Sequence, residues 1–150
     1  MKKWLTGGLE RITGRVVEAK LRDSAQLASL QVGVGRVNAI LNAERLGPAS
    51  SLHEAEFKVF SQFGDDGIIQ HLLRHVELRP AERTFVEFGV ENYLESNTRF
   101  LLVNDNWRGL VMDGSARNIN FVRQQDLHWR HDLTAVEAFI DAANVNDLIR

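Results

Sequence analysis

The chain has 150 residues, of which 44% are hydrophobic and 25% charged, and its formal net charge is -2. This size and composition predict a globular protein with a substantial core, and the near-neutral charge gives no support to a nucleic-acid partner. The absence of cysteine excludes disulfides, cysteine nucleophiles and thiolate metal sites. No apolar run reaches the length of a membrane span, and the two N-terminal lysines are not followed by the apolar segment of a signal peptide, so we expect a cytoplasmic protein.

The first third of the chain differs in charge from the rest. Residues 1–50 contain 8 Lys/Arg and 4 Asp/Glu, whereas residues 51–150 contain 10 and 16. Over 2–22, basic residues accompany an apolar stripe with helical spacing, formed by Leu5, Leu9, Ile12 and Val16. The pattern predicts an amphipathic helix that packs on a protein surface or contacts a membrane surface.

A second helical pattern follows over 27–41. Its apolar residues alternate in spacing by three and four positions, which is typical of a coiled coil, and they are Leu27, Leu30, Val34, Val37 and Leu41. Gly33 and Gly35 weaken this helix by about 1 kcal/mol each. We therefore predict a helical N-terminal extension over 1–46 that packs on the domain or forms a homodimer through 27–41. A linker over 47–53, beginning Gly-Pro, separates it from a domain over 54–150.

Helices and strands alternate after the linker. Helices are predicted over 65–76, with Asp65 or Asp66 as the N-cap, over 97–103, 116–125 and 144–150. Strands are predicted over 84–88, 110–112 and 136–140, and a loop around His128 and His131 leads into the third strand. This alternation predicts an α/β fold with a parallel, doubly wound sheet, whose ligands bind beyond the carboxyl ends of the strands.

An acidic residue lies at each predicted strand end: Glu87, Asp113 and Asp141. A carboxylate after the second strand can accept hydrogen bonds from the ribose hydroxyls of a nucleoside. The turn after the first strand, residues 89–95, has one glycine and two acids, whereas a pyrophosphate needs several glycines and no negative charge. The pattern therefore favours a cofactor with a nucleoside end and a cationic end, such as S-adenosylmethionine, over a nicotinamide dinucleotide.

Four blocks of sequence carry a resemblance to a known family. They are "FSQFGDDGII", "FVEFGVENYLESNTRFLL", "NWRGLVMDGS" and "FIDAANVNDLI", and they occur in order between Glu54 and Arg150. In this region the chain resembles the FkbM-like S-adenosylmethionine-dependent methyltransferases. The resemblance implies a class I methyltransferase (Rossmann-like) fold and methyl transfer to the hydroxyl of a sugar-type, glycan or other small-molecule acceptor.

The resemblance also implies roles for particular residues. Glu87 and Gly89 match the family's first cofactor motif, with Glu87 on the ammonium side, and Asp113 matches the ribose-binding acid. Asp141 lies where such folds contact adenine, and Ser96 and Asn97 match a block that caps the helix under the cofactor. Glu91 and Tyr93 stand where class I enzymes often have further glycines. The predicted cofactor-binding residues are Glu87, Gly89, Asn92, Ser96, Asn97, Asp113, Gly114 and Asp141; the catalytic base is not identified, and no metal site is expected.

Family members continue beyond the position of Arg150 into four further strands of a seven-stranded sheet. We therefore expect the N-terminal part of a methyltransferase, truncated after the third strand. Two alternatives remain open at this point. One is a non-catalytic remnant or a helical interaction module built on 1–46, and the other is a nicotinamide-dependent oxidoreductase of the same fold class.

Overall fold

A computed structural model describes residues 25–148 of the chain, so the helix predicted over 2–22 lies outside the described residues. The chain divides into two compact units, residues 1–34 and 35–150. The division falls within a helix that covers residues 25–45, which agrees with the helix predicted over 27–41. Among the described residues, no helix combines the length and the hydropathy needed to cross a bilayer.

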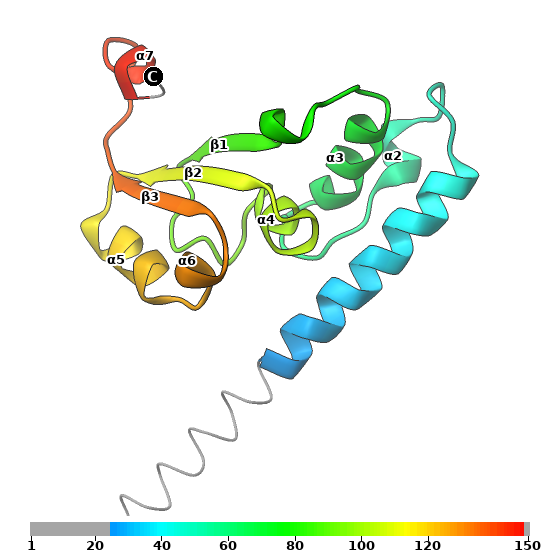
Figure 1. Cartoon of the computed structure of the whole chain (residues 1–150), viewed down its shortest axis with the longest axis horizontal. Coiled ribbons are helices and arrows are strands. Elements are labelled where there is room, and N and C mark those ends of the chain that lie inside the picture. The colour runs from blue at the N-terminus through cyan, green and yellow to red at the C-terminus, as the bar shows by residue number, and fades with distance from the viewer. Residues whose placement is uncertain (1–24, 149–150) are drawn as a thin grey trace, which may run out of the picture. The chain divides into compact units, whose positions relative to one another are not determined.

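The second unit is built on a three-stranded parallel sheet (Figure 1). Its strands are β1 (Thr84–Phe88), β2 (Arg108–Asp113) and β3 (Leu133–Glu137), in the order β1-β2-β3. The predicted α/β fold with a parallel sheet is confirmed. The sequence predicts the third strand over 136–140, and this boundary is wrong. Leu133 and Ala135 are buried at alternate positions, as a strand packed on a core requires, whereas Phe139 is exposed.

Helices precede and connect the strands. Before β1 come α2 (Leu52–Ala55), α3 (Asp65–Arg74) and the 3₁₀ turn η1 (Pro80–Glu82). Between the strands lie α4 (Arg99–Asp105), α5 (Ala116–Gln124) and the short α6 (Leu127–Arg130), and α7 (Val145–Leu148) follows β3. The helices predicted over 65–76, 97–103 and 116–125 are present with bounds that differ by one or two residues. α7 lies within the helix predicted over 144–150, whose end is outside the described residues, and α6 replaces the loop predicted around His128.

The core lies on one face of this sheet. Side chains alternate between the two faces of a strand, so Phe85, Val111 and Ala135 point to the same side. There they meet residues of α4 and α5, including Leu102, Ile119 and Val122, in one buried cluster, and α5 and α6 lie on this side of the sheet in Figure 1. On the opposite face, Val86 and Phe88 of β1 are 45% and 53% exposed. Met112 of β2, opposite Phe88, is 1% exposed, so this second face is open at β1 and covered at the end of β2.

Residues 35–46 pack against later segments of the second unit. A Cβ atom on Gly35 would lie 2.3 Å from Val59 and 2.9 Å from Phe100, so only glycine allows this close approach. The Asn42 amide donates to the carbonyl of Ala55 at 2.9 Å. Within the expected linker over 47–53, α2 already begins, with Ser51 as its N-cap. The division of the described structure thus lies at residue 34 rather than at the Gly-Pro sequence.

Candidate functional site

The carboxyl ends of the three strands lie side by side. In the strand register, Phe88 of β1 is opposite Met112, and Asp113 at the end of β2 is opposite Glu137 at the end of β3. Sequence reasoning missed Glu137 because it placed the third strand too far along the chain. Asp141, the acid expected at this strand end, lies beyond β3. Its carboxylate accepts the N–H groups of Ala143 (2.8 Å) and Asn144 (2.9 Å) at the start of α7.

The loop that leaves β1 has an unusual backbone. Gly89, Glu91 and Tyr93 have φ angles of 72°, 49° and 60°, in the left-handed region. For residues other than glycine this conformation costs on the order of 1 kcal/mol, and it persists where surrounding contacts fix it. Glu91 and Tyr93 therefore adopt backbone conformations that glycine adopts more readily.

Tyr93 supplies part of the packing that fixes this loop. Its side chain is fully buried, and its hydroxyl forms a 3.1 Å hydrogen bond with Thr98. The Arg99 guanidinium donates to the Tyr93 carbonyl and lies 4.8 Å from the centre of the Phe60 ring. Burial raises the pKa of Tyr93 well above its usual range, so the phenol stays neutral.

Glu87 binds the segment that leads into the helix after the loop. Its carboxylate accepts four hydrogen bonds, from the hydroxyls of Ser96 and Thr98 and from the backbone N–H groups of Asn97 (3.1 Å) and Thr98 (3.1 Å). The sequence predicts Ser96 as the N-cap of this helix. Instead Thr98 is the N-cap residue, and Ser96 is buried and bonded to Glu87. Three of these bonds end on Oε2 and one on Oε1, so the protein itself occupies most of the acceptor positions of Glu87.

Asp113 joins the loops that follow β1 and β2. It is 9% exposed and accepts the N–H of Glu91 at 2.9 Å, the N–H of Ser115 at 2.9 Å and the amide of Asn118 at 3.0 Å. Because three of about four acceptor positions are occupied, one remains for a ligand hydroxyl. Gly114, the next residue, is exposed, and a Cβ atom there would meet only Phe139 and Ala138 at ordinary contact distances.

Asn92 and Asn97 lie on the loop between β1 and α4. The Asn92 side chain accepts the N–H of Leu94 at 3.0 Å, and its carbonyl accepts the amide of Gln125 at 3.2 Å. Asn97 is exposed. An open hollow of about 670 Å³ lies beside α5 and is lined by polar residues and one aromatic, namely Asn92, Ser115, Arg117, Asn118, Asn120, Phe121 and Gln124. The structure thus brings Asn92 next to the turn that follows Asp113.

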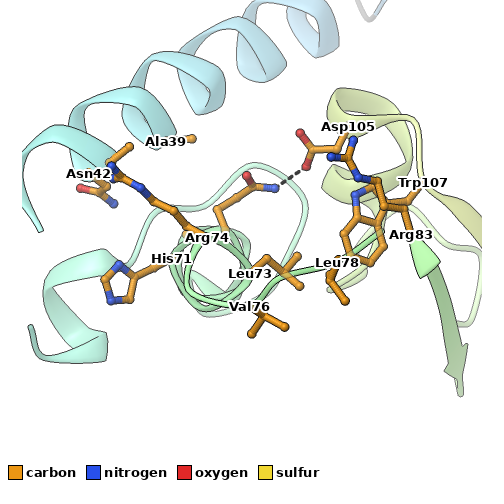
Figure 2. A pocket seen from close by; sticks show the side chains of 13 residues that line it. Ala39, Asn42, His71, Leu73, Arg74, Val76, Leu78, Arg83, Asp105 and Trp107 are labelled. Atoms are coloured by element: carbon orange, nitrogen blue, oxygen red, sulfur yellow. Dashed lines mark hydrogen bonds between the residues drawn. The ribbon is translucent and has the colours of Figure 1, made fainter. Parts of the chain in front are cut away.

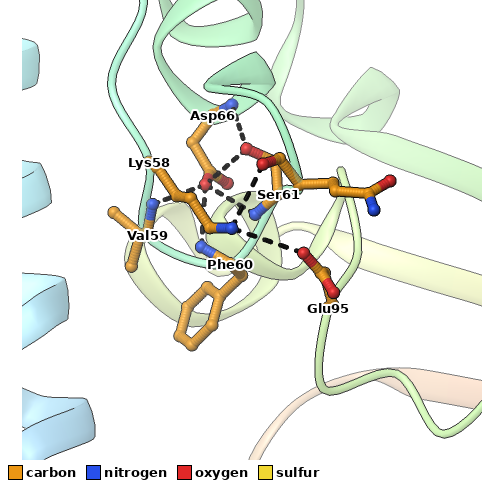
Figure 3. Close-up of polar contacts among 7 residues, drawn as sticks. Lys58, Val59, Phe60, Ser61, Asp66 and Glu95 are labelled. Atoms are coloured by element: carbon orange, nitrogen blue, oxygen red, sulfur yellow. Dashed lines mark hydrogen bonds and ion pairs between the residues drawn. The ribbon is translucent and has the colours of Figure 1, made fainter.

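Asp66, in the segment "FSQFGDDG", is a buried carboxylate that fixes the backbone of residues 59–61 (Figure 3). Asp66 is 1% exposed and accepts the N–H groups of Val59, Phe60 and Ser61 at 2.7–2.8 Å. The Phe60 carbonyl in turn accepts the N–H of Ser96 at 3.1 Å. The sequence predicts Asp65 or Asp66 as the helix N-cap, whereas Gly64 is the N-cap of α3 and Asp66 folds back onto the preceding segment.

A pocket of about 320 Å³ lies elsewhere, among α3, α4 and residues 39–43 (Figure 2). Its lining includes Arg83, which precedes β1, and Trp107, which precedes β2, so it lies at the amino ends of the strands. Asp105 lines it and accepts hydrogen bonds from the amides of Gln70 and Asn104, and burial raises the pKa of this carboxyl group. The pocket is therefore separate from the predicted cofactor edge.

The two histidines with metal-ligand spacing pack on each other. The His71 and His75 rings lie edge to face with centroids 4.9 Å apart. No group of three or more metal-ligating side chains occurs within residues 25–148.

The carboxyl edge of β1 and β2 thus combines one partly available carboxylate with a loop held by hydrogen bonds and by the buried Tyr93. It can accept a ligand hydroxyl, and the N–H groups of Asn97 and Thr98, just before α4, already bond to Glu87. No protein-family model, curated protein or solved structure matches this chain.

Proposed function

We propose that this chain binds S-adenosylmethionine at the carboxyl edge of β1 and β2 and belongs to an S-adenosylmethionine-dependent methyltransferase. In this proposal one ribose hydroxyl bonds to the remaining acceptor position of Asp113, and the loop 89–96 borders the methionine end. Glu87 shapes that loop and does not contact the cofactor directly. Gly89, Asn92, Ser96, Asn97 and Gly114 are the loop and turn residues around the cofactor.

The position of Asp113 supports a nucleoside ligand. In open parallel sheets, ligands bind beyond the carboxyl ends of the strands, and an acid after the second strand accepts ribose hydroxyls. Asp113 has this position, and its bonds to Glu91 and Ser115 fix its orientation before any ligand arrives. A pre-oriented acceptor binds a ligand without a further ordering cost.

The hydrogen bonds of Glu87 favour S-adenosylmethionine over NAD as the cofactor. A dinucleotide places its pyrophosphate on the N–H groups of the helix that follows the first strand. In this chain the Glu87 carboxylate already accepts the N–H groups of Asn97 and Thr98. A pyrophosphate would compete with this carboxylate for the same donors and would be repelled by its charge. The observation favours S-adenosylmethionine, whose methionine end is cationic, over NAD.

The proposed reaction, methyl transfer, is based on the resemblance to the FkbM-like family. Methyl transfer from a sulfonium depends mainly on alignment of the acceptor with the methyl group, and a hydroxyl acceptor also needs a base. We propose a sugar-type or other small-molecule hydroxyl as the acceptor. The predicted contact between Asp141 and adenine requires that the segment before α7 lies over the cofactor.

Calorimetric titration of the purified chain with S-adenosylhomocysteine tests the proposal. We expect saturable binding that Asp113→Asn weakens about tenfold or more, since a good hydrogen bond to a charged group contributes about 1.5–3 kcal/mol. The matched control is Asp132→Asn, an exposed acid just before β3, at the amino ends of the strands, which should leave affinity unchanged. Circular dichroism of each variant verifies folding.

Three outcomes contradict the proposal. They are tighter binding of NAD than of S-adenosylhomocysteine, equal loss of affinity in both variants, and no binding by a folded chain. The last outcome would favour an interaction module over a cofactor-binding protein.

A further inference from the structure

A stripe of large apolar side chains lies exposed along the helix over 25–45. Every member of the stripe is more than half exposed: Leu27 58%, Leu30 64%, Val34 54%, Val37 56% and Leu41 53%. The spacing alternates between three and four residues, so Leu27, Val34 and Leu41 occupy a positions of a heptad and Leu30 and Val37 occupy d positions. We call these five residues the seam.

Other positions in the C-terminal half of this helix pack within the second unit. Gly35 packs on Val59 and Phe100, Asn42 donates to the Ala55 carbonyl, and Leu46, just past the helix, is 8% exposed. These contacts fix residues 35–45 in helical form with Val37 and Leu41 directed to solvent. A helix that is already folded loses little conformational entropy when a partner binds it.

We propose that the seam is covered by the seam of a second copy of this chain, in a two-stranded coiled coil. Knobs at a and d positions need holes with the same heptad spacing, which an identical helix supplies. The flanking e and g positions next to the centre of the seam hold Gln31, Gly33, Asn38 and Ile40, which are uncharged. Two identical helices therefore meet without repulsion between like charges.

The size of the seam sets the strength of this dimer. Asp23 and Glu44 occupy the d positions before and after the seam, so its apolar part ends there. Two such stripes bury on the order of 1,000 Å² in total, near the lower limit for a specific interface. The dimer is therefore expected to dissociate on dilution, and it is independent of the cofactor proposed above.

Sedimentation equilibrium over a range of concentrations tests the proposal on the full 150-residue chain. We expect the average mass to rise from that of one 17.0 kDa chain to twice that value. Leu30→Lys/Val37→Lys should remain monomeric at every concentration. The matched control, Ala25→Lys/Ser29→Lys, adds the same charge at exposed positions of this helix outside the seam and should dimerise like the original chain. A monomeric original chain, or equal loss of dimer in both variants, would overturn the proposal.

Cross-linking gives a second test that does not depend on destabilising the helix. Because the chain has no cysteine, Val34→Cys introduces a single thiol. We test the parallel arrangement, in which Val34, at an a position in the middle of the seam, faces the same residue of the other copy. We expect a disulfide-linked dimer on mild oxidation of Val34→Cys and at least tenfold less from Ser29→Cys. Leu27→Cys, at the preceding a position, should cross-link as well, because parallel helices bring equivalent a positions together. Equal cross-linking at positions 34 and 29 would overturn the proposal.

Discussion

Glu87 and Asp113 are carboxylates near the ends of neighbouring strands, and the protein uses them in different ways. Glu87 accepts four hydrogen bonds from residues 96–98 and completes the start of α4. Asp113 accepts three and keeps one acceptor position. The alternating strand pattern indicates both acids in the sequence. Their partners do not follow from it, because they come from loops whose course depends on the buried Tyr93.

Glu87→Gln tests the structural role of the first carboxylate. The amide has only one oxygen and places an NH₂ group against the donors of residues 96–98. We expect the free energy of unfolding to fall by about 2–3 kcal/mol, which is the cost of mispaired, partly buried hydrogen bonds to a charged group. Urea unfolding measures it. Glu137→Gln, at an exposed strand end, is the control and should change stability by less than about 0.5 kcal/mol. An equally small effect at Glu87 would contradict this role.

At the level of an element, two glycines on one helix differ in the space around their Cβ positions. A Cβ atom on Gly33 would have no neighbouring atom within 4 Å, whereas the Cβ position of Gly35 is filled by the buried side chains of Val59 and Phe100. The sequence places both glycines in a helical pattern and assigns the same cost to each. Only packing distinguishes a glycine that weakens the helix from one that allows close approach.

Alanine at these two positions should therefore shift stability in opposite directions. We expect Gly33→Ala to stabilise the protein by about 0.5–1 kcal/mol, because alanine loses less backbone entropy in a helix. Gly35→Ala should destabilise it by about 1–3 kcal/mol, because the added methyl group overpacks the contact with Val59 and Phe100. Thermal unfolding followed by far-UV circular dichroism compares the two variants. Destabilisation of similar size in both would refute the close approach at Gly35.

At the scale of the whole molecule, the described structure covers one face of the sheet and leaves the other face open at β1, although Met112 of β2 is buried there. Parallel sheets are normally packed on both faces. Here the cluster formed by Phe85, Val111 and Ala135 with α4 and α5 fills one face, while Val86 and Phe88 remain about half exposed on the other. An exposed apolar patch of this kind favours binding of a further layer or of apolar molecules.

Removal of this patch should reduce binding of a hydrophobic dye without unfolding the protein. We expect Val86→Thr/Phe88→Thr to lower the fluorescence of bound anilinonaphthalene sulfonate at least twofold while changing stability by less than about 1–2 kcal/mol, since both residues are partly solvated in the folded state. Phe121→Thr removes an aromatic ring of similar exposure, 44%, from α5 and serves as the control. Equal loss of fluorescence in the control would show that the dye binds elsewhere.

The sequence by itself determined the elements of this protein and their order. Hydrophobic periodicity depends on neighbours along the chain, and it predicted the helix over 27–41, the parallel α/β sheet and the acids Glu87 and Asp113 at strand ends. Tertiary structure alone decided what those residues contact. It moved the third strand to Leu133–Glu137, placed Glu137 rather than Asp141 beside Asp113, and made Asp66 a buried support for the segment that holds Ser96. These features depend on hydrogen bonds and packing between distant segments, which periodicity does not encode.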